Sequence, residues 1–238
     1  LNTSEKDNDL FYGNINAGGL IRLTGSPENL NLDISARTKR NSVFFIPLYG
    51  SEEVMESDFI VFKESDTSPK EEDEKKYEVD LRGLTMNFTL DVTPEAEVQL
   101  IFDPKIGDII SGRGTGNLLI SIDPLGNFEI NGNYTIEEGD YLFTLQNVIN
   151  KRFEVKRGGQ IVWSGIPDEA EIDLQAVYPL KTSVYPLAPD GDPSLKKRIP
   201  VECRIDMTGK LLSPLIQTEI ELPTADQQTR NIVSNAIN

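Results

Sequence analysis

The feature of this sequence that most constrains its fold is an alternation of apolar and polar residues that recurs along the whole chain. In the segment GNFEINGNYTIEEGDYLFTLQ (126–146), apolar residues or glycine occupy every second position from Phe128 to Ile136. The pattern resumes at Tyr141 and Phe143, after a short acidic turn. A period of two is typical of a β-strand with one apolar and one polar face. The question is what the apolar face contacts.

The same period recurs in roughly a dozen segments, which predicts an all-β fold. Clear examples are residues 30–36, 84–92, 96–102, 118–122, 170–178 and 199–211. Parallel sheets give continuous apolar runs, so this alternation favours antiparallel pairing with one covered face. Short turns rich in Gly, Asn, Asp and Pro join the segments, and Gly158-Gly159 is predicted to form a hairpin turn.

The size of the apolar face shows that it must be covered. About twelve strands of nine residues, at ~4.8 Å spacing and ~3.3 Å per residue, give roughly 1,700 Å². The largest apolar patch on a soluble monomer is usually about 300–600 Å². The sheet therefore folds onto itself as a β-sandwich, closes into a barrel, or curves into a trough filled by something apolar.

Glycines on the apolar face bear on this choice. Gly112, Gly114 and Gly116 continue the alternation of Leu118 and Ile120, so they lie on the same face of the strand. Glycine at such positions permits a sharp bend or the close approach of another chain or a ligand. Bulges and corners of a sandwich explain these glycines as well. A membrane-spanning barrel needs aromatic girdles, and with 8% aromatic residues the sequence shows no such spacing.

Two regions depart from the strand pattern. Residues 63–80 are charged and nearly free of apolar side chains, which predicts a mobile acidic loop within one domain that extends over residues 1–224. After the cap sequence Thr224-Ala225-Asp226, apolar residues at i,i+4 spacing predict the start of a helix over 225–238. The chain has no initial Met and stops in mid-pattern, so we expect a piece of a longer protein.

Charge excludes several classes of partner. The chain has 39 acidic and 23 basic residues, a formal net charge of −16. Nucleic acids and anionic membrane surfaces need clustered Lys and Arg, so neither is expected as a partner. No apolar run approaches the ~18 residues of a membrane helix, so we expect no membrane span in this fragment.

The sequence offers little for catalysis. There is no histidine, and the single cysteine, Cys203, lies in the apolar register of its strand. No nucleophile motif or dinucleotide-binding loop occurs in a suitable context. Asp190 and Asp192 in APDGDPS could hold Ca²⁺, but turn chemistry also explains them and is the favoured explanation. We therefore expect no catalytic residues, no metal and no cofactor.

Three stretches of the second half resemble a known family: residues 138–178, 197–216 and 221–238. They contain, in order, G-x-Y-x-F near V-I-N-K, F-x-V-x-x-G-G-x-I-x-W-x-G, A-x-I-D-L-x-A-x-Y, V-x-C-x-I-x-M-T-G-x-L, and a closing L-P before the helix. This order resembles the C-terminal region of the TamB family, most strongly over residues 110–238. Ile166 stands where the family pattern has an Asp.

The resemblance implies a β-taco, which is a long antiparallel sheet curved into a U-shaped trough with an apolar interior. It implies a periplasmic segment of an envelope protein anchored in the inner membrane of a diderm bacterium. The implied partner is TamA or another Omp85-type outer-membrane barrel. The implied functions are phospholipid transport towards the outer membrane and, as the alternative, chaperone-like assembly and secretion of outer-membrane proteins. A sealed β-sandwich with a structural role is a third possibility.

On this reading, the apolar series of the central strands lines a groove that holds an acyl chain or an amphipathic β-strand. The predicted groove-lining residues are Leu118, Ile120, Ile122, Phe128, Ile130, Tyr134, Ile136, Tyr141, Phe143, Leu145, Phe153, Val155, Ile161, Trp163, Ile172, Leu174, Val201, Cys203, Ile205 and Met207.

Overall fold

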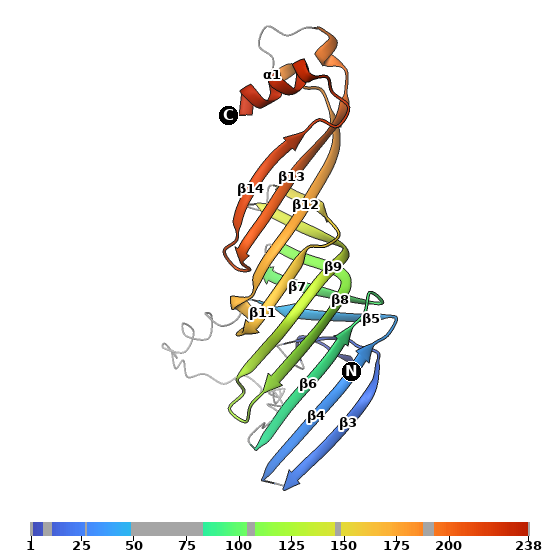
Figure 1. Cartoon of the computed structure of the whole chain (residues 1–238), viewed down its shortest axis with the longest axis vertical. Coiled ribbons are helices and arrows are strands. Elements are labelled where there is room, and N and C mark those ends of the chain that lie inside the picture. The colour runs from blue at the N-terminus through green and yellow to red at the C-terminus, as the bar shows by residue number, and fades with distance from the viewer. Residues whose placement is uncertain are drawn as a thin grey trace, which may run out of the picture.

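The structure is a computed structural model that describes residues 2–6, 11–26, 28–48, 83–103, 108–145, 149–187 and 193–237. These residues form one 14-stranded sheet and a C-terminal helix, in an elongated arrangement (Figure 1). The all-β prediction, with a short C-terminal helix, is confirmed. The predicted acidic loop 63–80, Asp190 and Asp192 lie outside the described residues, as does the side chain of Leu145.

The elements follow the alternating segments closely. The strands are β1 (Asn2–Thr3), β2 (Tyr12–Asn14), β3 (Ala17–Ser26), β4 (Asn29–Thr38), β5 (Ser42–Pro47), β6 (Leu84–Val92), β7 (Ala96–Asp103), β8 (Asp108–Ile122), β9 (Phe128–Leu145), β10 (Ile149–Val155), β11 (Gln160–Gly165), β12 (Glu171–Thr182), β13 (Ile199–Lys210) and β14 (Leu215–Glu221). The helices are the 3₁₀ turns η2 (Pro167–Glu169), η3 (Tyr185–Leu187) and η4 (Pro193–Lys196), and α1 (Gln227–Ile237).

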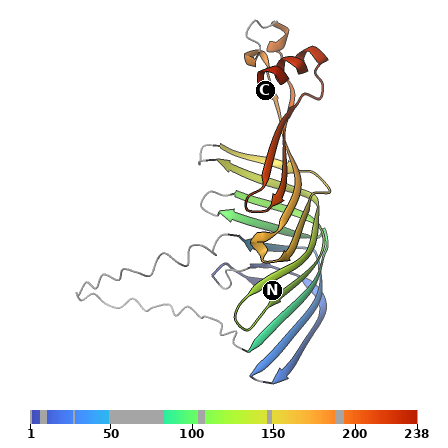
Figure 2. The same ribbon diagram turned by 60° about the vertical axis from the view of Figure 1, so that its left-hand side comes forward.

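The sheet is folded along a line, so that it forms two leaves. β8 and β9 run through this line, whereas β2/β3, β4/β5, β6/β7 and β10/β11 are consecutive strands separated by a short turn at it. We call the line the spine. Leaf A contains β3, β4, β6, β11 and the adjoining halves of β8 and β9, and leaf B contains β2, β5, β7, β10 and the other halves. Figure 2 shows the leaves meeting at one curved edge.

The spine has a clear cause in β8 and β9. Arg113 pairs with Glu138 and Gly114 pairs with Ile136, which leaves Glu137 as an extra residue in a bulge. A Cβ atom on Gly114 would lie 2.0 Å from the carbonyl oxygen of Thr135, so a side chain there is incompatible with the bend. Bulges bend strands and increase their twist. The inner-face glycines thus permit the sharp bending that was one reading of the sequence.

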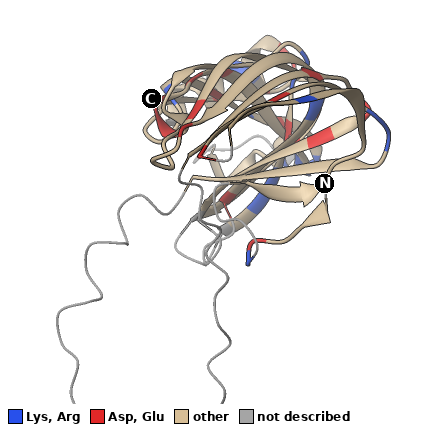
Figure 3. Cartoon of the chain, turned by 90° about the horizontal axis from the view of Figure 1, so that it is seen from below, with Lys and Arg blue, Asp and Glu red and all other residues tan. Residues whose placement is uncertain are grey.

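The leaves pack face to face around one apolar core. Buried residues from both leaves contribute, among them Ile46 and Leu100 from leaf B and Ile130 and Ile161 from leaf A. Viewed along the long axis, the sheet curves round so that the leaves face each other (Figure 3). A smaller cluster forms where Val233 of α1 packs against Val201 and Leu222. The helix therefore covers one end of β12 and β13.

Two features differ from the sequence predictions. β4 pairs with β6, and β5 with β7, in parallel. The reason is that the segment β4–β5 and the segment β6–β7 both run from leaf A to leaf B. Each leaf has one polar face whatever the strand direction, so alternation did not reveal these pairs. The predicted hairpin at Gly158-Gly159 is wrong: β10 and β11 both lie between β9 and β12 and pair with those strands instead. The turn is a corner at the spine.

Candidate functional site on the inner face

The pairing registers place apolar side chains in rows across the inner face, because paired residues point to the same side of a sheet. The first row is Ile21, Ile34, Phe88, Ile120 and Ile130, from β3, β4, β6, β8 and β9. The second is Leu23, Leu32, Met86, Ile122 and Phe128. The apolar face thus continues without a charged residue in these rows as far as β3, the last strand of leaf A.

Burial falls towards β3 along the first row. In the first row Ile130 is 0% exposed, Phe88 and Ile34 are half-buried, and Ile21 is 68% exposed. The cause is an unequal length of the two leaves: leaf A ends in the ten-residue strands β3 and β4, whereas leaf B ends in β1 and β2, of two and three residues. The inner face of β3 therefore has little of leaf B opposite it.

The other end of the sheet repeats this arrangement. Leu174 of β12 pairs with Met207 of β13, which pairs with Ile216 of β14. Leu174 is 1% exposed and Ile216 is 47% exposed. Ile220, on the same face of β14, borders a hollow of about 520 Å³ that lies between β14 and α1. We call the inner apolar face, from Ile21 and Leu23 to Ile216 and Ile220, the lane. Its middle is covered and both its ends are exposed.

The structure places the predicted groove-lining residues on this face, apart from Leu145. Most are buried, whereas Phe128, Phe143 and Cys203 are half-buried. Val201 belongs to the smaller cluster beneath α1. These side chains pack on one another between the leaves, so a ligand in the middle of the lane requires the leaves to part.

A few polar groups lie within the lane. Trp163 of β11 is 2% exposed, and its indole Nε1 has no hydrogen-bond partner among the described residues. The Tyr134 hydroxyl donates to the carbonyl oxygen of Gly112, at 3.0 Å, and thereby links the two halves of the bend. Burial raises the pKa of the Cys203 thiol and of the Tyr134 hydroxyl, so both stay protonated at neutral pH.

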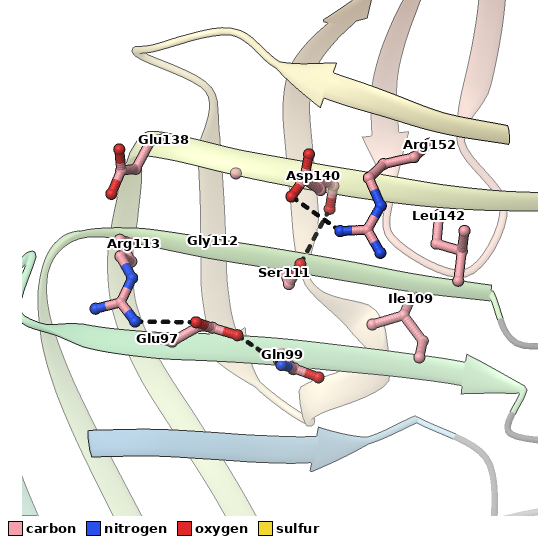
Figure 4. Close-up of a pocket in the computed structure, with 11 residues that line it drawn as sticks. Glu97, Gln99, Ile109, Ser111, Gly112, Arg113, Glu138, Asp140, Leu142 and Arg152 are labelled. Atoms are coloured by element: carbon pink, nitrogen blue, oxygen red, sulfur yellow. Dashed lines mark hydrogen bonds and ion pairs between the residues drawn. The ribbon is translucent and has the colours of Figure 1, made fainter. Parts of the chain in front are cut away.

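The outer face is mostly polar and carries several ion pairs. A hollow of about 510 Å³ on the outside of leaf B is lined by residues of β7, β8, β9 and β10 (Figure 4). Arg113 forms an ion pair with Glu97 at 3.0 Å, and Arg152 with Asp140 at 3.4 Å. Within each pair the two charges neutralise each other at the surface.

The described residues lack two features. They contain no group of three or more His, Cys, Asp or Glu side chains that could hold a metal ion. Within them no helix is both long enough and apolar enough to cross a membrane.

The residues at the two ends of the lane are not among the groove-lining residues predicted from the sequence. Ile21, Leu23 and Ile216 lie outside the predicted set, although Gly19, Ile21 and Leu23 do alternate. β3 precedes the region in which the family motifs are strong, and its exposure depends on the shortness of β1 and β2, which no local pattern reveals.

A comparison with protein families gives a match over almost the whole chain. The family model described as TamB C-terminal domain matches residues 1–237. The match therefore includes the first hundred residues, where the motifs were weak. No curated protein matches the chain.

Proposed function

This chain belongs to the TamB C-terminal domain family, and from that premise we propose that it carries phospholipid acyl chains along the lane. It is a segment of a TamB-like protein of the cell envelope, in a family of translocation and assembly modules for outer-membrane biogenesis. The proposal further places it in the periplasm, in a protein anchored in the inner membrane. There it acts without catalysis and delivers lipid towards an Omp85-type barrel in the outer membrane.

The observation that carries this proposal is that the lane is apolar apart from a few polar groups and is exposed at both ends. From β3 to β14 it crosses nine strands of the described sheet, and the eight steps of ~4.8 Å between them give roughly 40 Å. One leaflet of a bilayer core is about 15 Å thick, so an acyl chain is shorter than the lane. Each CH₂ group removed from water gains about 0.8 kcal/mol, which requires an apolar surface without interruption.

The covered middle of the lane is compatible with such a ligand if the leaves separate locally. Their contact there is made by apolar side chains, such as Phe11 of leaf B against Phe88 and Phe128 of leaf A. Apolar contacts have no fixed direction, so contacts between the leaves can be exchanged for contacts with an acyl chain. A structural domain sealed throughout would not account for the two exposed ends.

A second function is favoured by the edge strands. β3 and β14 each pair on one side within the described sheet and carry exposed apolar residues at alternate positions. An amphipathic strand of an unfolded outer-membrane protein could add to such an edge through backbone hydrogen bonds. This would make the chain a chaperone-like assembly module.

Adjacent residues of β3 provide a matched test of the lipid proposal. Ile21 faces the lane at 68% exposure, whereas Leu20 faces outwards at 60% exposure. We expect Ile21→Asp and Leu20→Asp both to fold, since neither side chain is buried. After incubation with phospholipid vesicles, native mass spectrometry should show bound phospholipid on the wild type and on Leu20→Asp, and at least tenfold less on Ile21→Asp.

Equal retention by the two variants would contradict the lipid proposal. If Ile21→Asp keeps its lipid but loses binding of an alternating β-strand peptide, the assembly function is the better account. Circular dichroism of both variants checks that the sheet is intact.

A further inference from the structure

Lys151 is a charged residue on an otherwise apolar surface. It pairs with Phe143 of β9 and shares parity with Phe153 and Val155, so its side chain extends from the inner face of leaf B. Its Nζ lies 5.4 Å from the centroid of the Tyr178 ring. Inner-face positions of the other described strands hold no basic residue. In a chain with a net charge of −16, a cation at this place calls for an explanation.

Asp108 lies on the other side of Phe143. It is the first residue of β8 and comes directly before Ile109, which pairs with Leu142. Its carboxylate forms a hydrogen bond with the Tyr141 hydroxyl, whose pKa is raised by burial, then by the charge of Asp108 and by this bond. Across β10, β9 and β8 the row is therefore Lys151, Phe143 and Asp108. Two steps of ~4.8 Å separate the charged residues, or roughly 10 Å.

This row marks the boundary between core and solvent along the margin of leaf B that lies away from the spine. Tyr141, two residues nearer the spine, is buried, Phe143 is half-buried and Lys151 is exposed. The rings of Phe143, Phe153 and Tyr178 form a cluster, with centroids 6.3 Å apart for the first pair and 5.6 Å for the second. An amphipathic ligand with its apolar part in the lane would therefore have its polar part at this row.

The charges define the chemistry of that polar part. An ammonium group such as that of Lys151 binds a phosphate oxygen, and a carboxylate such as that of Asp108 binds a cationic amine. The same carboxylate repels a second anionic group. A headgroup that carries both a phosphodiester and an ammonium can contact both residues, whose backbone positions lie roughly 10 Å apart in the row.

We propose that Lys151 and Asp108 form a headgroup site for zwitterionic phospholipids, with the phosphate on Lys151 and the ammonium on Asp108. This inference rests on the proposed function, because it assigns the headgroup of the lipid whose acyl chains occupy the lane.

The test compares three lipids with identical acyl chains: phosphatidylethanolamine, phosphatidylglycerol and diacylglycerol. Each is offered in vesicles to the chain, and the lipid retained is measured by native mass spectrometry. We expect the wild type to retain phosphatidylethanolamine best. Lys151→Gln should lower retention of both phospholipids about tenfold, as the loss of one charge-assisted hydrogen bond implies, and leave diacylglycerol unchanged. Asp108→Asn should remove the preference for phosphatidylethanolamine over phosphatidylglycerol.

Lys181→Gln is the matched control, because Lys181 is an exposed lysine on the outer side of β12. Unchanged lipid preferences in Lys151→Gln, or the same loss in Lys181→Gln, would overturn the headgroup site while diacylglycerol binding still supports the lane. If the wild type retains none of the three lipids, the proposed function fails together with this inference.

Discussion

Individual residues determine where each strand of this sheet can bend. Gly114 faces the core at a position where a Cβ atom would meet the carbonyl oxygen of Thr135 at 2.0 Å. At Gly112, two residues away, the nearest atom to such a Cβ is the Cγ2 of Ile136, at 3.3 Å. Both glycines lie on the inner face, but one excludes any side chain and the other leaves room for a methyl group after a small adjustment.

This difference gives a prediction within one strand. Gly114→Ala should lower the free energy of unfolding by about 2–4 kcal/mol, because the backbone of β9 must move away and the bulge is lost. Gly112→Ala should change it by less than about 1 kcal/mol. Urea unfolding, followed by the fluorescence of Trp163, measures both values. A similar loss in the two variants would show that the bend does not depend on close approach at Gly114.

Residue-scale features were only partly accessible from the sequence. The alternation of apolar and polar residues identified the inner face, and the predicted apolar residues from Leu118 to Met207 do lie on it. Parity could not show how far each is covered, since Ile21 and Ile130 lie in the same row and differ from 68% to 0% in exposure. Coverage depends on the opposite leaf, which is distant in sequence. Lys151 was missed because a single lysine in an alternating strand has no local signal.

At the scale of elements, periodicity predicted strands well and their partners poorly. Alternation in β8, β9 and β13 gave their position, because each has one buried face. The parallel pairs β4/β6 and β5/β7 require knowledge of the spine, which separates each segment into two strands. Ile166 precedes η2 at its N-cap and makes no side-chain hydrogen bond there. The Asp of the family pattern would supply such a bond at this position.

The terminal helix α1 has a cap whose effect depends on pH. The Asp226 carboxylate accepts a hydrogen bond from the backbone N–H of Thr229, at 2.7 Å, and this bond lowers the pKa of Asp226. A group whose folded pKa lies below its unfolded value stabilises the fold above the unfolded value, near 4 for a carboxyl. The stabilisation is lost as the pH falls through the folded pKa.

We therefore expect α1 to loosen in acid before the sheet does. The NMR signals of the Val233 methyl groups, which are buried beneath the helix, should shift as the pH falls below about 4. In Asp226→Asn the neutral amide oxygen still caps the helix, so that part of the shift should disappear. An unchanged acid transition in Asp226→Asn would assign it to other carboxylates.

At the scale of the whole molecule, the account depends on two leaves that can separate. Phe11 of leaf B stacks on Phe128 of leaf A, with ring centroids 5.6 Å apart. Phe11→Cys and Phe128→Cys, combined with Cys203→Ser, allow the leaves to be joined by a short bis-maleimide. We expect the linked protein to take up at least tenfold less phospholipid, because the leaves can no longer separate at this contact. The same variant with each cysteine capped separately is the control.

The most direct measurement of the lane uses Trp163, the single tryptophan of the chain, which lies buried on the inner face. Phospholipids with brominated acyl chains quench indole fluorescence on contact. If acyl chains enter between the leaves, such lipids quench Trp163 in the unlinked protein and not in the protein with linked leaves. If lipid binds to the unlinked protein while Trp163 remains unquenched, or if linking the leaves leaves the quenching unchanged, acyl chains do not travel between the leaves.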